Sequence, residues 1–291
     1  MSNLALYAVA VLVWGSTWLV IKFQLGLVPP LVSVAWRFAL AALMLLAYSA
    51  IRGRPLRFGV RDQVWIALQG VLLFGINYAG VYLSEQYLTS GLVAVVFSLV
   101  VGMNAVGMRL FFAQPIRPLT VLAALIGIAG VTLVFWPEML RFSSSADQYR
   151  GLALAVGATV VASLGNMVAT RIHRRALPVL QVNGWSMLYG AAFIAVVAVA
   201  GGQRFAFEFS WSYVASLLYL SLFGSAIAFG AYLTLMRRIG ADRASYTAVA
   251  IPVVALLLST AFEHLRWQPE TFVGVALCVA GSVLMLRRRA A

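Results

Sequence analysis

Residues 111–133 read FFAQPIRPLTVLAALIGIAGVTL, and residues 262–284 repeat their pattern as FEHLRWQPETFVGVALCVAGSVL. Six residue types recur at an offset of 151, and in the first stretch they are Phe111, Pro118, Thr120, Ala129, Gly130 and Leu133. Two further matches are Phe74-Gly75 with Phe223-Gly224 at an offset of 149, and Gly80-x-Tyr82-Leu83 with Gly230-x-Tyr232-Leu233 at 150. A nearly constant period with small insertions is typical of a duplicated unit. The sequence therefore predicts two halves of one design.

The composition is that of a membrane protein. Of the 291 residues, 63% are hydrophobic and only 10% are charged, whereas about a quarter of an average soluble domain is charged. No soluble core of this size could bury so much apolar surface, so lipid must be most of the solvent. The single Cys278 excludes an internal disulfide and a cysteine metal cluster. We expect no cofactor and no metal, and we interpret residues 1–21 as a retained span rather than a signal peptide.

Apolar stretches long enough to cross about 30 Å of hydrocarbon recur along the chain. They fall near residues 4–22, 31–51, 64–84, 90–110 and 118–136, and again near 151–170, 179–200, 212–234, 243–262 and 271–286. These stretches predict an all-α polytopic membrane protein with ten transmembrane helices, five in each half. The first repeat is expected over residues 1–137, a linker outside the cytoplasm over 138–150, and the second repeat over 151–291.

Basic residues are unevenly divided between the two sides of these spans. One side, which includes the C-terminus, carries fifteen Lys or Arg and two acids, and the other carries five cations and six acids. The positive-inside rule predicts that the richer side, and with it both termini, is cytoplasmic. The net charge of +13 is then a signal of topology and not of nucleic-acid binding. Five spans per half also predict that the two repeats are inverted, as in alternating-access carriers with a site between the halves.

Several short motifs resemble those of one carrier family. They are Trp14-Gly15-Ser16-Thr17, Arg37-Phe38 and, in the last two spans, Pro252, Glu263, Gly274 and Gly281. Over nearly its whole length, and once in each half, the chain resembles the EamA family of the drug/metabolite transporter superfamily. It is most similar to the bacterial amino-acid exporters of the YddG type, named for aromatic substrates. The resemblance implies a ten-helix carrier of the bacterial inner membrane, with a central cavity and with spans five and ten packed at the periphery.

The first half departs from this pattern. It has Val101 and Phe112 at the positions where the second half has Pro252 and Glu263. Proline removes a helical hydrogen bond and bends a helix. We therefore expect span four to lack the proline-linked bend that is available to span nine.

Arg37 is the one strong charge inside a predicted span. An ionisable group in hydrocarbon is costly and usually faces a cavity or a partner. Its guanidinium could attract a substrate carboxylate, or its long stem could let it reach the interface or cap a carbonyl. The eight acids, in contrast, all lie in loops or at span ends. Because ion-coupled carriers usually hold the ion on a buried carboxylate, we expect facilitated diffusion or exchange, with Glu85 and Glu263 as the nearest substitutes for a coupling acid.

Polar and aromatic side chains recur on single faces of several spans. Hydroxyl groups in membrane helices often only join helices, whereas a buried amide requires a cavity or an interhelical bond. Large amphipathic rings can hold an apolar side chain while their polar ends stay hydrogen-bonded. The candidate substrate-binding residues are Trp18, Asn77, Tyr78, Tyr82, Phe97, Asn104, Ser163, Asn166, Trp185 and Tyr246. Gly127 with Gly130, and Gly274 with Gly281, give thin helix faces for close approach, either within the chain or by a second copy.

The leading hypothesis is a carrier that exports amino acids and related small metabolites, and not an enzyme. His173 and His264 belong to no recognisable metal or catalytic motif. The expected partners are the small-molecule substrate and the bilayer, without nucleic acid, and a weak homo-oligomer through the glycine-rich helices is left open. The alternatives are a lipid flippase with a groove open to the bilayer and a proton-coupled drug or metabolite exporter. Buried Asn and Arg residues argue against a purely structural scaffold.

Overall fold

The computed structural model describes the chain except for residues 25, 27, 141, 143–144, 264–267 and 287–291. Over the described residues, every regular element is helical. In the part of the chain that the structure describes, seven helices are long and apolar enough to cross a membrane, and three shorter apolar helices cover Asn3–Thr17, Pro118–Val134 and Pro269–Met285. The shorter helices coincide with the predicted first, fifth and tenth spans. The chain is therefore an all-helical, multi-pass membrane protein.

The elements of the two halves follow each other in a similar order. The first half contains α1 (Asn3–Ile21), η1 (Lys22–Gln24), α2 (Pro30–Ile51), α3 (Val60–Gln69), η2 (Gly70–Ile76), α4 (Asn77–Ser84), α5 (Ser90–Ser98), α6 (Val100–Phe112), α7 (Pro118–Val134) and α8 (Trp136–Leu140). The second half contains α9 (Ala146–His173), α10 (Val179–Ala200), α11 (Trp211–Tyr219), η3 (Leu220–Ile227), α12 (Ala228–Ile239), α13 (Ala241–Ala244), α14 (Thr247–Glu263) and α15 (Pro269–Leu286).

Local sequence explains where several helices begin. Pro30 and Pro118 occupy the first turns of α2 and α7, where a missing N–H costs nothing and the fixed φ angle suits a helix. Ser145 accepts a hydrogen bond from the Gln148 amide at 3.3 Å at the start of α9. Ser210 does the same for the Tyr213 amide before α11. Such caps satisfy amides that have no partner within the helix.

The third and eighth predicted spans share an irregular backbone. Each consists of two α-helical parts joined by a π-helical turn, which is η2 in the first half and η3 in the second. The two turns contain the repeated pairs Phe74-Gly75 and Phe223-Gly224. Wide turns of this kind are rare and are often found at functional sites.

Glycines allow the closest helix contacts. A β-carbon at Gly190 in α10 would lie 2.7 Å from the carbonyl oxygen of Gly70. A β-carbon at Gly274 in α15 would lie 2.7 Å from the carbonyl oxygen of Gly130 in α7. Without a strong hydrophobic force between helices in lipid, small residues allow the close packing that joins them. The glycine faces of α7 and α15 are occupied within one chain, so a second copy could use them only if these helices separated.

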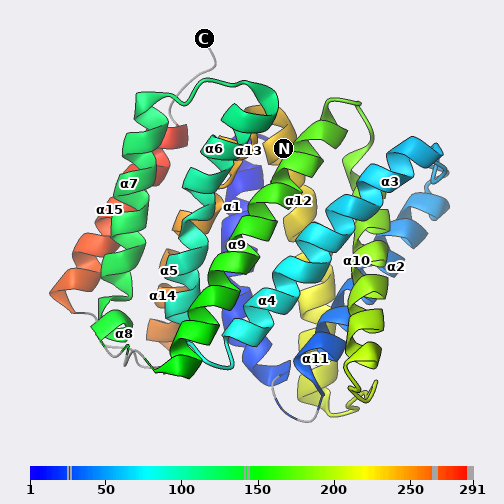
Figure 1. Ribbon diagram of the computed structural model, residues 1–291, viewed down its shortest axis with the longest axis horizontal. Helices are drawn as coiled ribbons and strands as arrows, with labels where there is room; N and C mark the ends of the chain where they lie inside the picture. Colours follow the sequence, from blue (N-terminus) through cyan, green and yellow to red (C-terminus); the bar gives the residue numbers. More distant parts are fainter. Residues whose placement is uncertain (25, 27, 141, 143–144, 264–267, 287–291) are drawn as a thin grey trace.

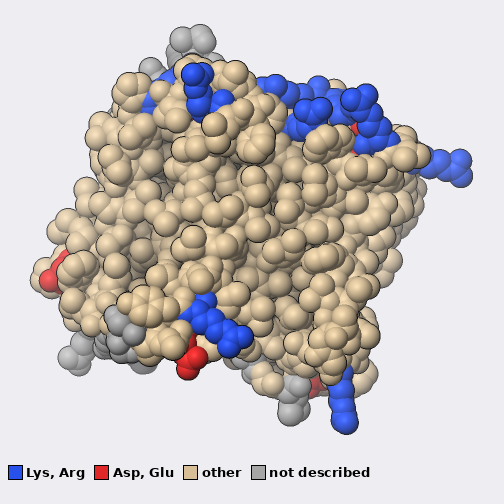
Figure 2. Space-filling model, in the orientation of Figure 1, with Lys and Arg blue, Asp and Glu red and all other residues tan. Residues whose placement is uncertain are grey.

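Figure 1 shows how these contacts arrange the helices. The pair α7 and α15 lies at one edge of the molecule, and α2, α3 and α10 lie at the opposite edge. In Figure 2, Lys and Arg side chains line the upper border, while the broad middle of the visible face carries no charged side chain. An uncharged band between charged borders is the surface that a bilayer requires.

The fourth and ninth predicted spans are interrupted at different places. Span four has no proline, yet it is interrupted at Leu99 between α5 and α6. The Leu99 amide bonds to the Val96 carbonyl at 3.1 Å, a tighter turn than that of an α-helix. In the second half, α14 continues through Pro252, and the break lies earlier, between α13 and α14. A local change of hydrogen-bond register therefore interrupts span four without a proline.

Candidate functional site

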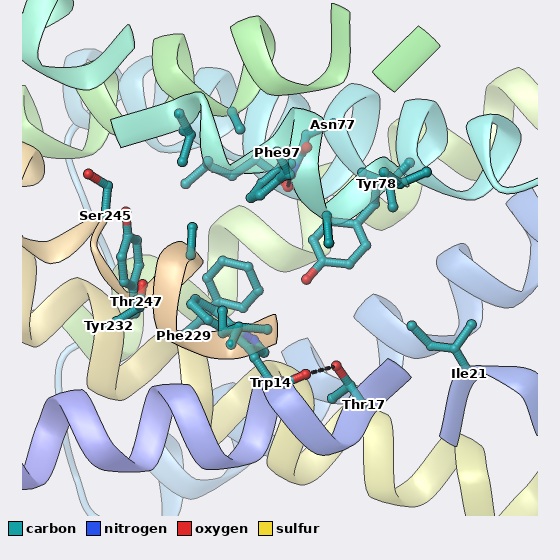
Figure 3. A pocket seen from close by; sticks show the side chains of 18 of the residues that line it. Trp14, Thr17, Ile21, Asn77, Tyr78, Phe97, Phe229, Tyr232, Ser245 and Thr247 are labelled. Atoms are coloured by element: carbon teal, nitrogen blue, oxygen red, sulfur yellow. Dashed lines mark hydrogen bonds between the residues drawn. The ribbon is translucent and has the colours of Figure 1, made fainter. Parts of the chain in front are cut away.

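A cavity lies among the helices of the two halves. Its volume is about 140 Å³. Side chains from α1, α2, α4, α5, α9, α12 and α14 form most of its wall, and Figure 3 shows several of them pointing into the space. The wall is largely apolar and aromatic, with a few polar groups, as in most small-molecule sites.

Arg37 lies in the wall of this cavity and is only 1% exposed. Its Nε donates to Ser225 Oγ at 2.9 Å, and its Nη1 lies 3.4 Å from the Tyr82 hydroxyl oxygen. Its Cζ lies 5.1 Å from the centre of the Tyr78 ring. No described carboxylate forms an ion pair with it. The guanidinium is therefore held inside the protein by neutral groups and does not reach the membrane interface.

Aromatic rings form a connected frame around the cavity. Trp14 and Phe229 are in edge contact, with ring centres 4.8 Å apart, and Phe38 contacts Tyr78 at 4.7 Å. Trp14 also donates its indole N–H to the Gly224 carbonyl at 3.0 Å, within the π turn η3. Figure 3 shows the Tyr78 hydroxyl and the Phe229 ring on facing sides of the space. Rings held in this way present rigid apolar surfaces to a ligand.

Buried amides separate into two groups. Asn77 and Asn166 line the cavity, whereas Asn104 lies behind it and is fully buried. Asn104 accepts from Asn166 Nδ2 at 3.5 Å and donates to the Ala241 carbonyl at 3.4 Å. Because Asn104 belongs to the first half and its partners to the second, this polar layer joins the halves directly beside the cavity.

The structure brings together part of the predicted site. Asn77, Tyr78, Tyr82, Phe97 and Asn166 line the cavity together with Arg37. The side chain of Trp18 is outside the described residues. The other four candidates, Asn104, Ser163, Trp185 and Tyr246, do not line it.

Two of these four have clear structural contacts elsewhere. Trp185 donates to the Leu56 carbonyl at 2.9 Å and stacks on Tyr189. Tyr246 is fully buried, and its hydroxyl donates to the Thr120 carbonyl at 3.4 Å. Neither residue is placed to touch a ligand in the cavity, because both side chains are directed to other helices.

Three aromatic residues of the cavity wall were absent from the predicted set. Trp14 belongs to the Trp14-Gly15-Ser16-Thr17 motif, and Tyr232 is the repeat counterpart of Tyr82. Both signals were present in the sequence. Phe229 carries no such signal, because one aromatic residue in an apolar span can face a neighbouring helix as well as a cavity.

Glu85 follows the last residue of α4 and lines the same cavity. One of its carboxylate oxygens is buried without a hydrogen-bond partner among the described residues. Burial raises the pKa of this carboxyl to about 7, because a low-polarity environment disfavours the charged form. The side chain of Glu263, the other acid considered for coupling, is outside the described residues.

A membrane-spanning helical bundle with an aromatic-lined cavity between its halves has the architecture of a membrane transporter. The model of the EamA-like transporter family matches residues 1–136 and again residues 149–287. The chain therefore belongs to the EamA-like transporter family.

Individual relatives agree with this assignment. The chain is 31% identical to the "Uncharacterized inner membrane transporter YedA" of Escherichia coli K12, over 88% of this chain and 81% of that protein. It is 22% identical to the "Uncharacterized transporter YoaV" of Bacillus subtilis, over 93% and 91% of the two chains. A solved structure described as "Crystal structure of protein" is similar with a TM-score of 0.80 and 20% identity, covering 98% and 96%. That likeness concerns the fold alone.

Proposed function

We propose that this protein exports amino acids and related small metabolites, including aromatic ones, across the bacterial inner membrane. The observation that carries the proposal is the buried Arg37 guanidinium in an aromatic-lined cavity, without an ion pair to a described carboxylate. A buried cation is costly unless it meets an opposite charge. A substrate carboxylate supplies that charge, and the rings of Tyr78, Tyr82 and Phe97 contact the substrate side chain.

The proposed transport cycle is alternating access between two inverted repeats of five helices. The two separate family matches support a duplicated unit, as do the π turns at equivalent places in the halves. Three shorter apolar helices at the places of spans one, five and ten support the count of ten. In such carriers the halves rock around a site near the middle of the membrane.

We propose facilitated diffusion or exchange as the form of energy coupling. In the described spans the acids lie near the ends, and Glu85 lies just beyond the span that precedes it. Proton coupling is the second candidate, and the specific observation that favours it is the Glu85 carboxyl in the cavity wall. Because its pKa is raised to about 7, this carboxyl would exchange a proton near physiological pH.

Flux into liposomes, measured with a panel of amino acids, tests the proposed function. We expect wild-type protein to move amino acids without an imposed proton or sodium gradient. Arg37→Gln should reduce flux by about tenfold or more, since it removes one charge-assisted contact, and Arg37→Lys should retain part of it. The matched control is Arg54→Gln, which changes an exposed arginine far from the cavity. If folded and correctly inserted wild-type protein transports no amino acid of the panel, amino-acid export is excluded.

Orientation is tested by reporters of membrane topology. The excess of basic residues on one side predicts cytoplasmic positions for a reporter after Ala291 and for one in the loop 52–57. The prediction for the first loop holds for any reporter position within residues 52–61. A reporter in the loop 143–145 should lie outside the cytoplasm. A cytoplasmic reporter at 143–145 contradicts the inverted-repeat arrangement, because an odd number of spans must separate it from the N-terminus.

A further inference from the structure

A second hollow lies at the basic side of the molecule. Its volume is about 540 Å³, and its wall is formed by the C-terminal ends of α6, α9 and α12 together with α13 and the segment before α7. We call it the basic bowl, defined by five arginines, Arg117, Arg174, Arg237, Arg238 and Arg243. In Figure 1 the helix ends that form it lie between the α7–α15 pair and the α2–α3 pair, beneath the upper border.

The charge of the basic bowl is strongly unbalanced. Among the described residues of its lining the single acid is Asp242, which interacts electrostatically with Arg243 and Arg117, and no described carboxylate forms an ion pair with any of the five arginines. The ion pair between Arg175 and Asp62, both described, lies outside the bowl. Like charges gathered around one hollow raise the local potential and concentrate small anions.

Topology alone does not account for this arrangement. The positive-inside rule requires basic loops on one side, but it does not require them to surround a hollow. Arg52, Arg54 and Arg57 lie on the same side, are exposed, and line neither cavity. The bowl therefore contains an additional feature, which is the convergence of guanidinium groups from separate helices.

Several of these arginines are held in position by neutral groups. Arg238 donates to the Met1 carbonyl at 2.8 Å, and Arg237 donates to the Leu177 carbonyl at 3.4 Å. The Cζ of Arg174 lies 4.2 Å from the centre of the Phe112 ring. Each guanidinium has five N–H donors, so these contacts leave donors available for a ligand.

His173 adds an independent observation. It lines the bowl, and its Nδ1 is buried without a hydrogen-bond partner among the described residues. Buried polar atoms are nearly always bonded, so an exception calls for a missing partner such as an ion. As a donor, this nitrogen suits an oxygen of an anion held by the arginines.

The bowl also lies in line with the central cavity. On α9, Asn166 lines the cavity, whereas Thr170 and His173 line the bowl. Their spacing of four and three residues places all three on one helix face. The layer of Asn104, Asn166 and the Ala241 carbonyl separates the two spaces.

We propose that the basic bowl binds a phosphate group, either of a free oxyanion or of a lipid headgroup, which bridges the two halves. Arg117 comes from the first half and the other four arginines come from the second. One anion between them relieves their mutual repulsion and forms charge-assisted hydrogen bonds, which are among the strongest in proteins. This inference concerns a site separate from the cavity and does not depend on the transported substrate.

Binding of inorganic pyrophosphate tests the proposal. The protein is placed in nanodiscs of phosphatidylcholine, and titration calorimetry is combined with thermal unfolding at constant ionic strength. We expect saturable binding and a rise in Tm, because a ligand that binds only the folded state stabilises it. The double variant Arg117→Gln/Arg243→Gln should bind at least about tenfold more weakly. Arg54→Gln is the control for general charge screening and should bind like wild type.

A charge-conserving variant and an anionic lipid complete the test. Arg117→Lys/Arg243→Lys keeps both charges and should retain much of the affinity, which separates lost charge from misfolding. Nanodiscs of phosphatidylglycerol without pyrophosphate test a lipid phosphate as the source of the same group. Stabilisation by this lipid, lost in the double glutamine variant, supports the site with a lipid ligand. Absence of both effects in wild type overturns the proposal, and so does an equal loss of binding in Arg54→Gln.

Discussion

The third and eighth predicted spans occupy equivalent places in the two halves. They have similar backbone conformations but different side chains toward the cavity. Both consist of two α-helical parts around a π turn, and Tyr82 and its counterpart Tyr232 both line the cavity. Around them the third span supplies Asn77, Tyr78 and Glu85. At an offset of 150 the eighth span has Ile227, Ala228 and Leu235.

This difference shows that a duplicated backbone can be kept while its side chains diverge. Both π turns lie close to neighbouring helices, since a β-carbon at Gly70 would clash with Ser186 and one at Gly224 would lie 2.8 Å from Cγ2 of Thr17. The charged groups of the cavity, Arg37 and Glu85, come from the first half alone among the described lining residues.

The largest expected effect concerns a pair of repeat-related glycines. A β-carbon at Gly80 would lie 2.9 Å from that of Ala158, whereas a β-carbon at Gly230 would have no neighbour within 4 Å. Gly80→Ala should therefore destabilise the protein by about 1–3 kcal/mol through overpacking. Gly230→Ala should be neutral or stabilising by up to about 1 kcal/mol. Thermal unfolding of both variants in one detergent measures the difference, and equal losses would show that the two spans pack alike.

The next effect concerns the aromatic side chains. Tyr82 contacts Arg37, so Tyr82→Ala should reduce flux of bulky amino acids by about tenfold, equivalent to ~1.4 kcal/mol. Flux of small amino acids should fall less, and Tyr78→Ala should show the same selectivity. Tyr232→Ala should produce a smaller loss, because the Tyr232 ring contacts Trp14 and, among the described residues, has no hydrogen bond or ring contact with Arg37.

Liposome flux with matched amounts of inserted protein distinguishes the outcomes. An equal loss for every substrate, accompanied by aggregation, would assign Tyr78 and Tyr82 to packing. Well-folded variants with unchanged flux and unchanged selectivity would contradict the aromatic pocket.

The smallest effect concerns Glu85, which has Leu235 as its counterpart. Its folded-state pKa is about 7 against 4.5 for the free group, so the folded protein binds this proton more tightly. Stability should fall as pH rises from about 4.5 to about 7 and then level off. We expect Tm to be lower at pH 8 than at pH 5. Glu85→Gln should remove most of the pH dependence of Tm. The control variant Glu270→Gln, at an exposed position, should retain it. An unchanged pH dependence in Glu85→Gln would exclude the Glu85 carboxyl as its origin.

Sequence reasoning found the cavity residues best where several of them share one helix face. Asn77, Tyr78 and Tyr82 follow each other within little more than one turn, and the structure places all three in the cavity wall. It was less successful for Trp185 and Tyr246, which are directed to other helices. In a span that is buried on several sides, periodicity does not distinguish a face against a cavity from a face against a neighbour.

The sequence by itself determined that the chain is surrounded largely by lipid, that its spans are helical and that one pattern occurs twice. These properties follow from the lengths of apolar runs and from residue spacing. It also contained the uneven division of basic residues between the two sides. Only the tertiary structure decided which groups meet. The neutral partners of Arg37, the glycine contacts of α7 with α15, and the arginines of the basic bowl each join residues far apart in the chain. Such long-range contacts depend on how helices pack, and packing is decided by the shapes of whole helix faces rather than by any local pattern.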